Sequence, residues 1–121
     1  MVKALLDTNI LIDFLNGIPE ARDELGRHGE KAISIISWME VMAGAEPDVR
    51  QKTRAFLDSF TVLPLEDRIA ERAVELRRAH HIKLPDAVIW GTAEVHSMLL
   101  VTRNIKDFPP DMPGIRVPYR L

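Results

Sequence analysis

The sequence predicts an α/β/α sandwich, in which helices cover both faces of a mainly parallel central sheet. Short apolar runs suited to buried strands alternate along the chain with longer segments whose apolar residues recur at helical spacing. Strands buried on both faces form nearly continuous apolar runs, and they are typical of parallel sheets covered by helices. With 121 residues, the chain is expected to fold as a single domain over residues 1–121 with a core of its own.

The expected strands and helices follow one another in a regular order. From the N-terminus they are a strand at residues 2–6, a helix to about residue 15, a helix at 19–27, a strand at 32–36, a helix from 37 toward 44, a helix opened at 47, a strand at 61–63, helices at 66–80 and 84–95, a strand at 98–102 and an edge strand at 115–117.

Capping and turn residues mark the ends of these elements. The segment Asp7-Thr8-Asn9 breaks the first apolar run with side chains able to cap a helix. Pro19 suits the first turn of the next helix, and Ser37-x-x-Glu40 matches a capping box after the second strand. Pro85 stands at the start of the most apolar helix, and residues 109–114 form an irregular loop rich in proline.

Composition limits the classes of function that the chain can have. Sixteen Lys and Arg against eighteen Asp and Glu leave a formal charge of −2, so charge alone does not indicate a nucleic-acid binder. Any contact with a polyanion would be local or helped by bound cations. The absence of cysteine excludes disulfides and thiolate metal sites. No stretch approaches the roughly 20 apolar residues of a membrane span, and we expect a soluble, cytoplasmic protein.

Three acidic residues stand at comparable places in the predicted fold. Asp7 follows the first strand, Glu40 is expected in the first turn of the helix after the second strand, and Asp86 lies in the first turn of the apolar helix. Each alone is explained by helix capping or by the helix dipole. Because the carboxyl ends of parallel strands share one edge of the sheet, we expect the three carboxylates to meet there.

Clustered carboxylates imply a bound cation. Unpaired carboxylates a few ångströms apart raise each other's pKa, which costs stability unless a cation neutralises them. Oxygen ligands without Cys or His at ligand spacing favour Mg²⁺ or Mn²⁺ over Zn²⁺. Such an ion can activate water and stabilise the charge that develops when water attacks a phosphodiester. The sequence therefore predicts metal-assisted phosphodiester hydrolysis.

Four motifs in order resemble those of the PIN-domain family, and in particular its VapC-type ribonuclease toxins. They are Leu5-Leu6-Asp7-Thr8-Asn9, Ser37-x-x-Glu40 with Gly44, Pro85-Asp86-Ala87, and Leu100-Val101-Thr102-Arg103-Asn104 with Asp107-Phe108. The resemblance covers the chain end to end. It implies an RNA endonuclease that uses Mg²⁺ or Mn²⁺, forms a homodimer, and is inhibited by a cognate antitoxin whose segment fills a groove near the acidic site.

The family's site residues transfer onto this chain with one departure. Asp7, Glu40 and Asp86 match the three core acids, but many relatives have an aspartate where this chain has Asn104. We rank Asp107 as the fourth acid and Asn104 as a polar neighbour of the site.

Three further residues are expected to support the site. Thr8 and Thr102 are expected to hold the carboxylates by hydrogen bonds. Arg103 is expected to contact an RNA phosphate, and its replacement by alanine should cost little stability.

Two other functions compete with this one. A haloacid-dehalogenase-like phosphatase also begins with an aspartate after its first strand, but its acid/base position holds Asn9 here. A PIN-like module that has lost catalysis and binds RNA or a partner is favoured by Asn104 and opposed by the three intact core acids. Mn²⁺ affinity would separate an enzyme from such a module.

Overall fold

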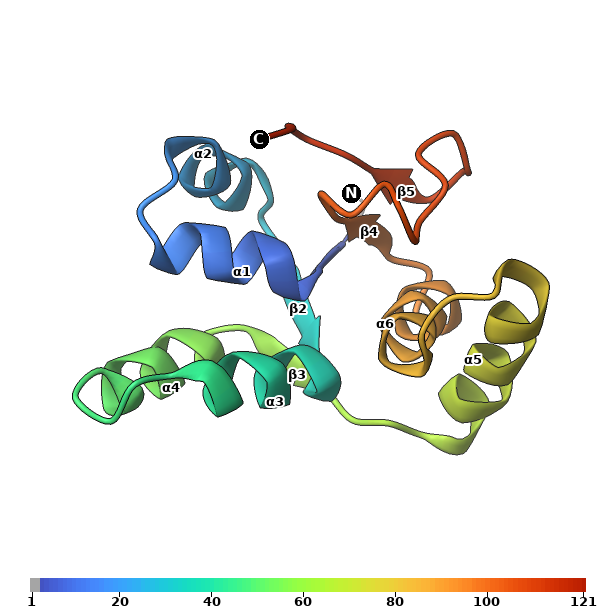
Figure 1. The fold of residues 1–121 in the computed structure, drawn as a ribbon, viewed down its shortest axis with the longest axis horizontal. Coiled ribbons are helices and arrows are strands. Elements are labelled where there is room, and N and C mark those ends of the chain that lie inside the picture. The colour runs from blue at the N-terminus through green and yellow to red at the C-terminus, as the bar shows by residue number, and fades with distance from the viewer. Residues whose placement is uncertain (1–2) are drawn as a thin grey trace.

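Five short strands form one sheet, and every neighbouring pair is parallel. The structure is a computed structural model that describes residues 3–121 (Figure 1); Val2, expected in the first strand, lies outside them. The sheet order is β3-β2-β1-β4-β5. The strands are β1 (Ala4–Leu6), β2 (Lys31–Ser34), β3 (Thr61–Leu63), β4 (Leu99–Val101) and β5 (Ile115–Arg116).

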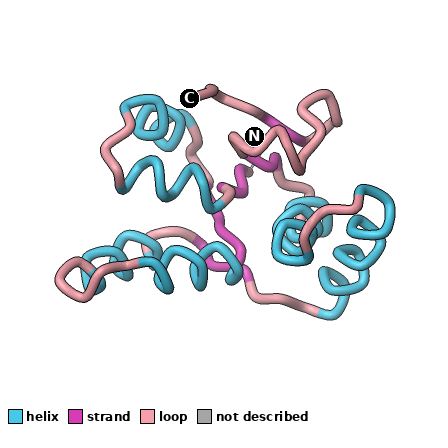
Figure 2. Tube along the Cα trace, in the orientation of Figure 1, coloured by secondary structure: helices cyan, strands magenta, loops and turns pink. Residues whose placement is uncertain are grey.

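Helices connect the strands and cover both faces of the sheet, as Figure 2 shows. They are α1 (Thr8–Leu15), α2 (Pro19–Arg27), α3 (Ile35–Gly44), α4 (Arg50–Asp58), α5 (Asp67–His80) and α6 (Leu84–Val95). The predicted α/β/α sandwich is confirmed, and its sheet is parallel throughout residues 3–121.

Two predicted helix starts are wrong. Helix α3 begins at Ile35, because the Ser34 hydroxyl accepts the Ile36 backbone N–H at 3.0 Å and caps it. The capping box expected from Ser37 therefore does not form, and Glu40 lies in the second turn. Helix α4 begins at Arg50 rather than Pro47.

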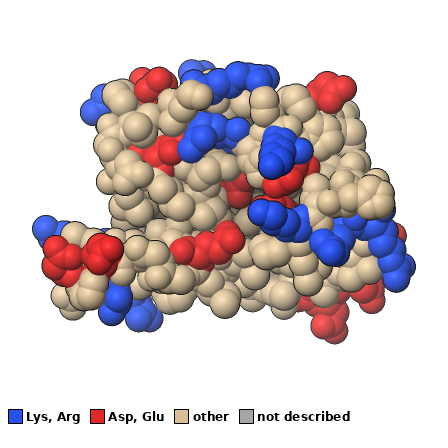
Figure 3. Space-filling view, in the orientation of Figure 1, with Lys and Arg blue, Asp and Glu red and all other residues tan. Residues whose placement is uncertain are grey.

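The surface mixes both signs of charge. On the face seen in Figure 3, Asp and Glu residues lie in the middle, where the ends of α1, α3 and α6 come near one another in Figure 1, and Lys and Arg residues lie above and to the right of them. Within residues 3–121, none of the helices combines the length and apolarity that a bilayer crossing requires.

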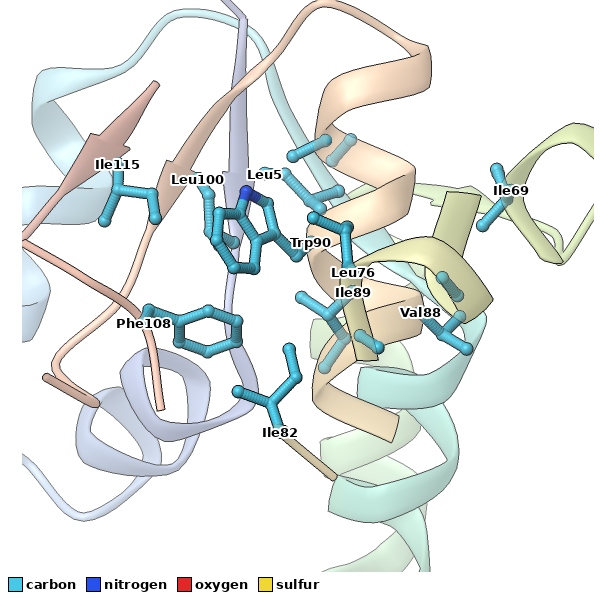
Figure 4. Close-up of a cluster of buried hydrophobic side chains, with 14 residues drawn as sticks. Leu5, Ile69, Leu76, Ile82, Val88, Ile89, Trp90, Leu100, Phe108 and Ile115 are labelled. Atoms are coloured by element: carbon cyan, nitrogen blue, oxygen red, sulfur yellow. The ribbon is translucent and has the colours of Figure 1, made fainter. Parts of the chain in front are cut away.

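Alternate residues of the strands face opposite layers of helices. Leu5 packs in a cluster with Ile69 of α5 and Trp90 of α6, shown in Figure 4. Its neighbours Ala4 and Leu6 pack in a second cluster with side chains of α1, α2, α3 and α4. Both faces of β1 are therefore buried, and the side chains on each face are apolar, as the continuous apolar run predicted. This rigid centre fixes the end of β1, where Asp7 begins.

Candidate active site

The first of the predicted acids lies where two neighbouring strands end at one edge of the sheet. Strand β1 lies between β2 and β4, and Asp7 follows it directly. The backbone N–H of Asp7 donates to the Val101 carbonyl oxygen at 2.9 Å, which ties the end of β1 to the end of β4. Thr102 is the residue that directly follows β4. The parallel topology alone therefore places Asp7 and Thr102 side by side.

Asp7 is held rigidly and is almost inaccessible to water, with an exposure of 3%. Its Oδ1 accepts the Thr8 backbone N–H at 2.8 Å, and its Oδ2 accepts the Thr102 hydroxyl at 2.7 Å and the Asn9 amide at 3.0 Å. Burial raises the pKa of Asp7 to about 6, and the charge of Glu40 adds to that effect, although the three hydrogen bonds oppose it. Asp7 is therefore fixed in orientation and electrostatically strained at neutral pH.

Glu40 reaches the same place from α3. Its Oε1 lies 2.7 Å from the Thr8 hydroxyl, which also lies 2.9 Å from the hydroxyl of the buried Ser37. The Thr8 hydroxyl donates to the carboxylate, and Ser37 can donate to Thr8 in turn. Because Glu40 is exposed but tethered through Thr8, its carboxylate stays next to the N-terminus of α1.

Asp86 and Asp107 form an interacting pair. Burial raises the pKa of Asp86 to about 7, and the charge of Asp7, a hydrogen bond with Asp107 and the charges of Asp107 and Glu40 add to this. The pKa of Asp107 is lowered, chiefly by a hydrogen bond from Asn104 and also by its bond with Asp86 and by the nearby lysines Lys83 and Lys106. The other three predicted acids thus lie within electrostatic reach of Asp86.

Asn104 supports Asp107. Its side-chain amide donates to Asp107 Oδ2 at 3.0 Å, and its side-chain oxygen accepts the Asp107 backbone N–H at 3.2 Å. The Asn104 backbone N–H in turn donates to the Thr102 hydroxyl oxygen at 3.0 Å. The residue that replaces the family's aspartate therefore lies beside the acid that we ranked fourth.

Arg103 is placed differently from our expectation. Its guanidinium donates to both carboxylate oxygens of Asp13, at 2.7 and 2.9 Å, so its charge is already compensated within the protein. The expectation that removing Arg103 would cost little stability is therefore revised, because it would leave Asp13 buried without its partner. Contact between Arg103 and RNA stays a prediction that this geometry does not favour.

Sequence reasoning assigned no supporting role to four residues that hold the site through hydrogen bonds. Asn9, Asp13, Ser37 and Tyr119 all make polar contacts there. Asn9 and Ser37 stood in the motifs quoted above, and Asp13 gave a further signal as a charged residue close to Ile10, Leu11 and Phe14 on the apolar side of α1.

The donor set fits a hard divalent cation. Four carboxylates, flanked by hydroxyl groups, supply the oxygen ligands that Mg²⁺ and Mn²⁺ prefer. Burial, and to a smaller extent the neighbouring carboxylates, raises the pKa values of Asp7 and Asp86, and a bound cation would favour their ionised forms. Within residues 3–121, no three carboxylate or imidazole groups converge on one point as ligands do, so these side chains would have to turn inward to share an ion.

Comparison with known proteins adds a family and several relatives. The family model described as PIN domain matches residues 4–109. Ribonuclease VapC10 of Mycobacterium tuberculosis is 37% identical over 113 residues, which cover 87% of this chain and 85% of that protein.

Solved structures of toxin-antitoxin systems are similar along nearly the whole chain. A toxin-antitoxin complex from Klebsiella pneumoniae is 46% identical with a TM-score of 0.93, covering 98% of this chain and 100% of that one. A DNA-bound VapBC from Salmonella typhimurium is 26% identical with a TM-score of 0.76, covering 96% of each chain.

Proposed function

The chain belongs to the PIN-domain family, and from this membership and its acidic site we propose that it is a metal-dependent endoribonuclease, the toxin of a toxin-antitoxin pair. One observation of the structure carries the proposal. Asp7, Glu40, Asp86 and Asp107 come from different elements and interact electrostatically at one edge of the sheet. The named relatives are ribonucleases and toxin-antitoxin complexes, which agrees with this chemistry.

The three core acids would hold Mg²⁺ or Mn²⁺, with Asp107 next to them. A cation bound there would lower the pKa of water and neutralise charge on the scissile phosphate. The protein's own part is orientation. Thr102 and Asn9 fix Asp7 through its Oδ2, and Thr8 fixes Glu40. These donors orient Asp7 and Glu40 before substrate arrives.

In the metal-free protein, a bound proton reduces the negative charge of the acidic site. With a pKa of about 7, the Asp86 carboxyl group still holds a proton near neutral pH. It can use that proton to donate a hydrogen bond to Asp107. Cation binding requires that proton to leave. The site is therefore expected to bind metal more tightly as pH rises.

A groove of about 450 Å³ beside the site fits the proposed antitoxin segment. It lies between α1, α3 and α4, and Glu40 forms part of its wall together with Glu46. The exposed apolar side chains Ile12, Leu15 and Val49 line it as well. A segment with apolar side chains and a basic group would match these walls and cover Glu40. The homodimer and the cytoplasmic location belong to the same proposal.

The two alternative functions can be distinguished from the proposed one. The haloacid-dehalogenase hypothesis is wrong, because the family matched over residues 4–109 is the PIN domain. A PIN-like module without catalysis would need no cation, so absence of Mn²⁺ binding by the purified protein would favour it.

Cleavage of a pool of structured RNAs tests the proposed function. The protein, freed of any copurified partner, is assayed with Mn²⁺ or with EDTA beside Asp86→Asn, and Asp23→Asn in the exposed part of α2 serves as the matched control. We expect the wild type and the control to cut RNA with Mn²⁺ but not with EDTA. We expect Asp86→Asn to cut RNA in neither condition. Cutting that persists in EDTA or in Asp86→Asn would contradict the proposal.

A further inference from the structure

Asp13 is a buried carboxylate that no step of the proposed chemistry uses. It lies on α1 with an exposure of 4% and accepts three hydrogen bonds. Two come from the Arg103 guanidinium at 2.7 and 2.9 Å, and one comes from the Tyr119 hydroxyl at 2.8 Å. Burial alone would raise the pKa of Asp13, but these donors lower it below its ordinary value. The carboxylate is therefore ionised and fully engaged.

Arg103 is held by hydrogen bonds through its backbone as well as through its side chain. Its backbone N–H donates to Asn9 Oδ1 at 3.1 Å, while its guanidinium binds Asp13 one turn further along the same helix. Asn9 also donates to Asp7. Helix α1 thus holds the first residues after β4 through two of its side chains.

The two neighbours of Arg103 are the residues that hold the acids. Thr102 donates to Asp7 Oδ2 at 2.7 Å, and Asn104 holds Asp107 through two hydrogen bonds. A shift of Arg103 along α1 would move both neighbours together. The orientation of Asp7 and Asp107 consequently depends on a contact that touches neither of them.

Tyr119 closes this contact from the C-terminal segment. Its ring packs against the cluster under α1, and its hydroxyl shares Asp13 Oδ2 with Arg103 Nε. The segment after β5 is therefore connected to the acidic site through Asp13.

We propose that Asp13, Arg103 and Tyr119 form a clamp that positions Thr102 and Asn104, and through them the acids Asp7 and Asp107. The inference rests on the proposed function and assigns Arg103 a positioning role in place of an RNA contact. Supporting residues of this kind commonly change activity or metal affinity about 10–100-fold when they are altered.

A second ion pair in the same protein provides a matched control. Arg116 of β5 binds Glu24 of α2 with the same two-bond geometry, at 2.7 and 2.9 Å. The side-chain exposures are 34% and 3%, against 32% and 6% for Arg103 and Asp13. In the part of the chain that the structure describes, neither side chain of the control pair contacts the four acids.

The test compares Arg103→Lys with Arg116→Lys, since lysine keeps the charge but cannot make the two-bond contact. With RNA and Mn²⁺, we expect Arg103→Lys to lower kcat about 10–100-fold while KM changes less than about threefold, and Arg116→Lys to change neither beyond about threefold. Asp13→Asn and Tyr119→Phe should lower kcat as well. Combining Asp13→Asn with Arg103→Lys should lower kcat little further, because both break one contact.

Two outcomes would overturn the clamp. A raised KM with unchanged kcat in Arg103→Lys would show that Arg103 binds RNA. An equal loss of kcat in Arg116→Lys would show a general effect of stability.

Amide hydrogen exchange of the metal-free protein decides the question independently of activity. The backbone N–H groups of Asn104 and Asp107 donate within the site. We expect their exchange to accelerate at least about tenfold in Arg103→Lys and not in Arg116→Lys. Equal exchange in both variants would refute the clamp even if the wild type cuts no RNA, whereas absence of cutting alone would count only against the proposed nuclease.

Discussion

Replacing Asp86 by asparagine should stabilise the metal-free protein above neutral pH. The asparagine side chain has the same shape and can still donate a hydrogen bond to Asp107. It lacks the negative charge that Asp7, Asp107 and Glu40 repel. The substitution therefore keeps the packing and the hydrogen bond while it removes the repulsion.

The size of the effect follows from the pKa of Asp86, which is raised from 3.8 to about 7. A carboxyl with a raised pKa binds more protons in the folded state, so this contribution to stability is complete below about pH 4 and is lost as pH rises to about 7. At about 1.4 kcal/mol per pH unit, the full loss is about 4 kcal/mol. Water around this partly buried side chain reduces it to about 2 kcal/mol.

Thermal unfolding in EDTA, followed by circular dichroism, measures this gain. We expect Asp86→Asn to raise Tm by about 8 °C at about pH 8, and by only about 3 °C at about pH 5, where less of the loss has accumulated. Asp23→Asn, an exposed change in α2, should leave Tm nearly unchanged at both. A fall in Tm for Asp86→Asn would show that Asp86 mainly stabilises the start of α6. A gain that does not depend on pH would also refute the repulsion argument.

Three further predictions concern the site and the packing of the helices. Thr102→Val removes a donor to Asp7, so the pH–rate profile should move to higher pH with a loss of kcat of about 10–100-fold, and an unmoved profile would count against this role. Calorimetry should show Mn²⁺ affinity rising at least about tenfold from about pH 5.5 to 8, because the acids must first lose protons; constant affinity would contradict it. Gly91→Ala would place a Cβ 3.3 Å from a backbone oxygen of α5, so the free energy of unfolding measured in urea should fall by about 1–3 kcal/mol. A Cβ added by Gly26→Ala in α2 meets nothing within 4 Å, and the free energy of unfolding should rise by about 0.5–1 kcal/mol.

The order of the elements could be predicted because each strand is a short apolar run between turn signals. Strand β3 at Thr61–Leu63 matches the predicted residues, and α2 at Pro19–Arg27 does as well. The boundary between β2 and α3 could not be placed, since Ile35 and Ile36 are β-branched and extend the apolar run. Two serines compete there as caps, and only the fold shows that the hydroxyl of the first one is used.

Asp7 and Glu40 could be predicted because they follow strand ends along the chain, and Asp86 could be predicted because it lies in the first turn of the most apolar helix. The residues that position them could not, since their contacts join distant parts of the sequence. Asp13 meets Arg103 across 90 residues and Tyr119 across 106. A single sequence gives local patterns such as caps and periodicity, and neither pattern indicates which arginine pairs with a buried aspartate. Arg103 followed a strand near the site, so its position suggested a ligand contact while its partner stayed hidden.

The charge of the site links its stability to its proposed chemistry. Parallel strands bring Asp7 and the helix that carries Glu40 to one edge, and the fold tolerates this because Asp7 and Asp86 retain protons up to about pH 6 and 7. The metal-free site is therefore less negative than four carboxyl groups would suggest, which limits repulsion of a polyanion. Exchange of two protons for one divalent cation would leave the net charge of the four acids unchanged but would concentrate two positive charges at a single point. A chain with a formal charge of −2 could in this way attract an RNA phosphate at one place without a basic surface.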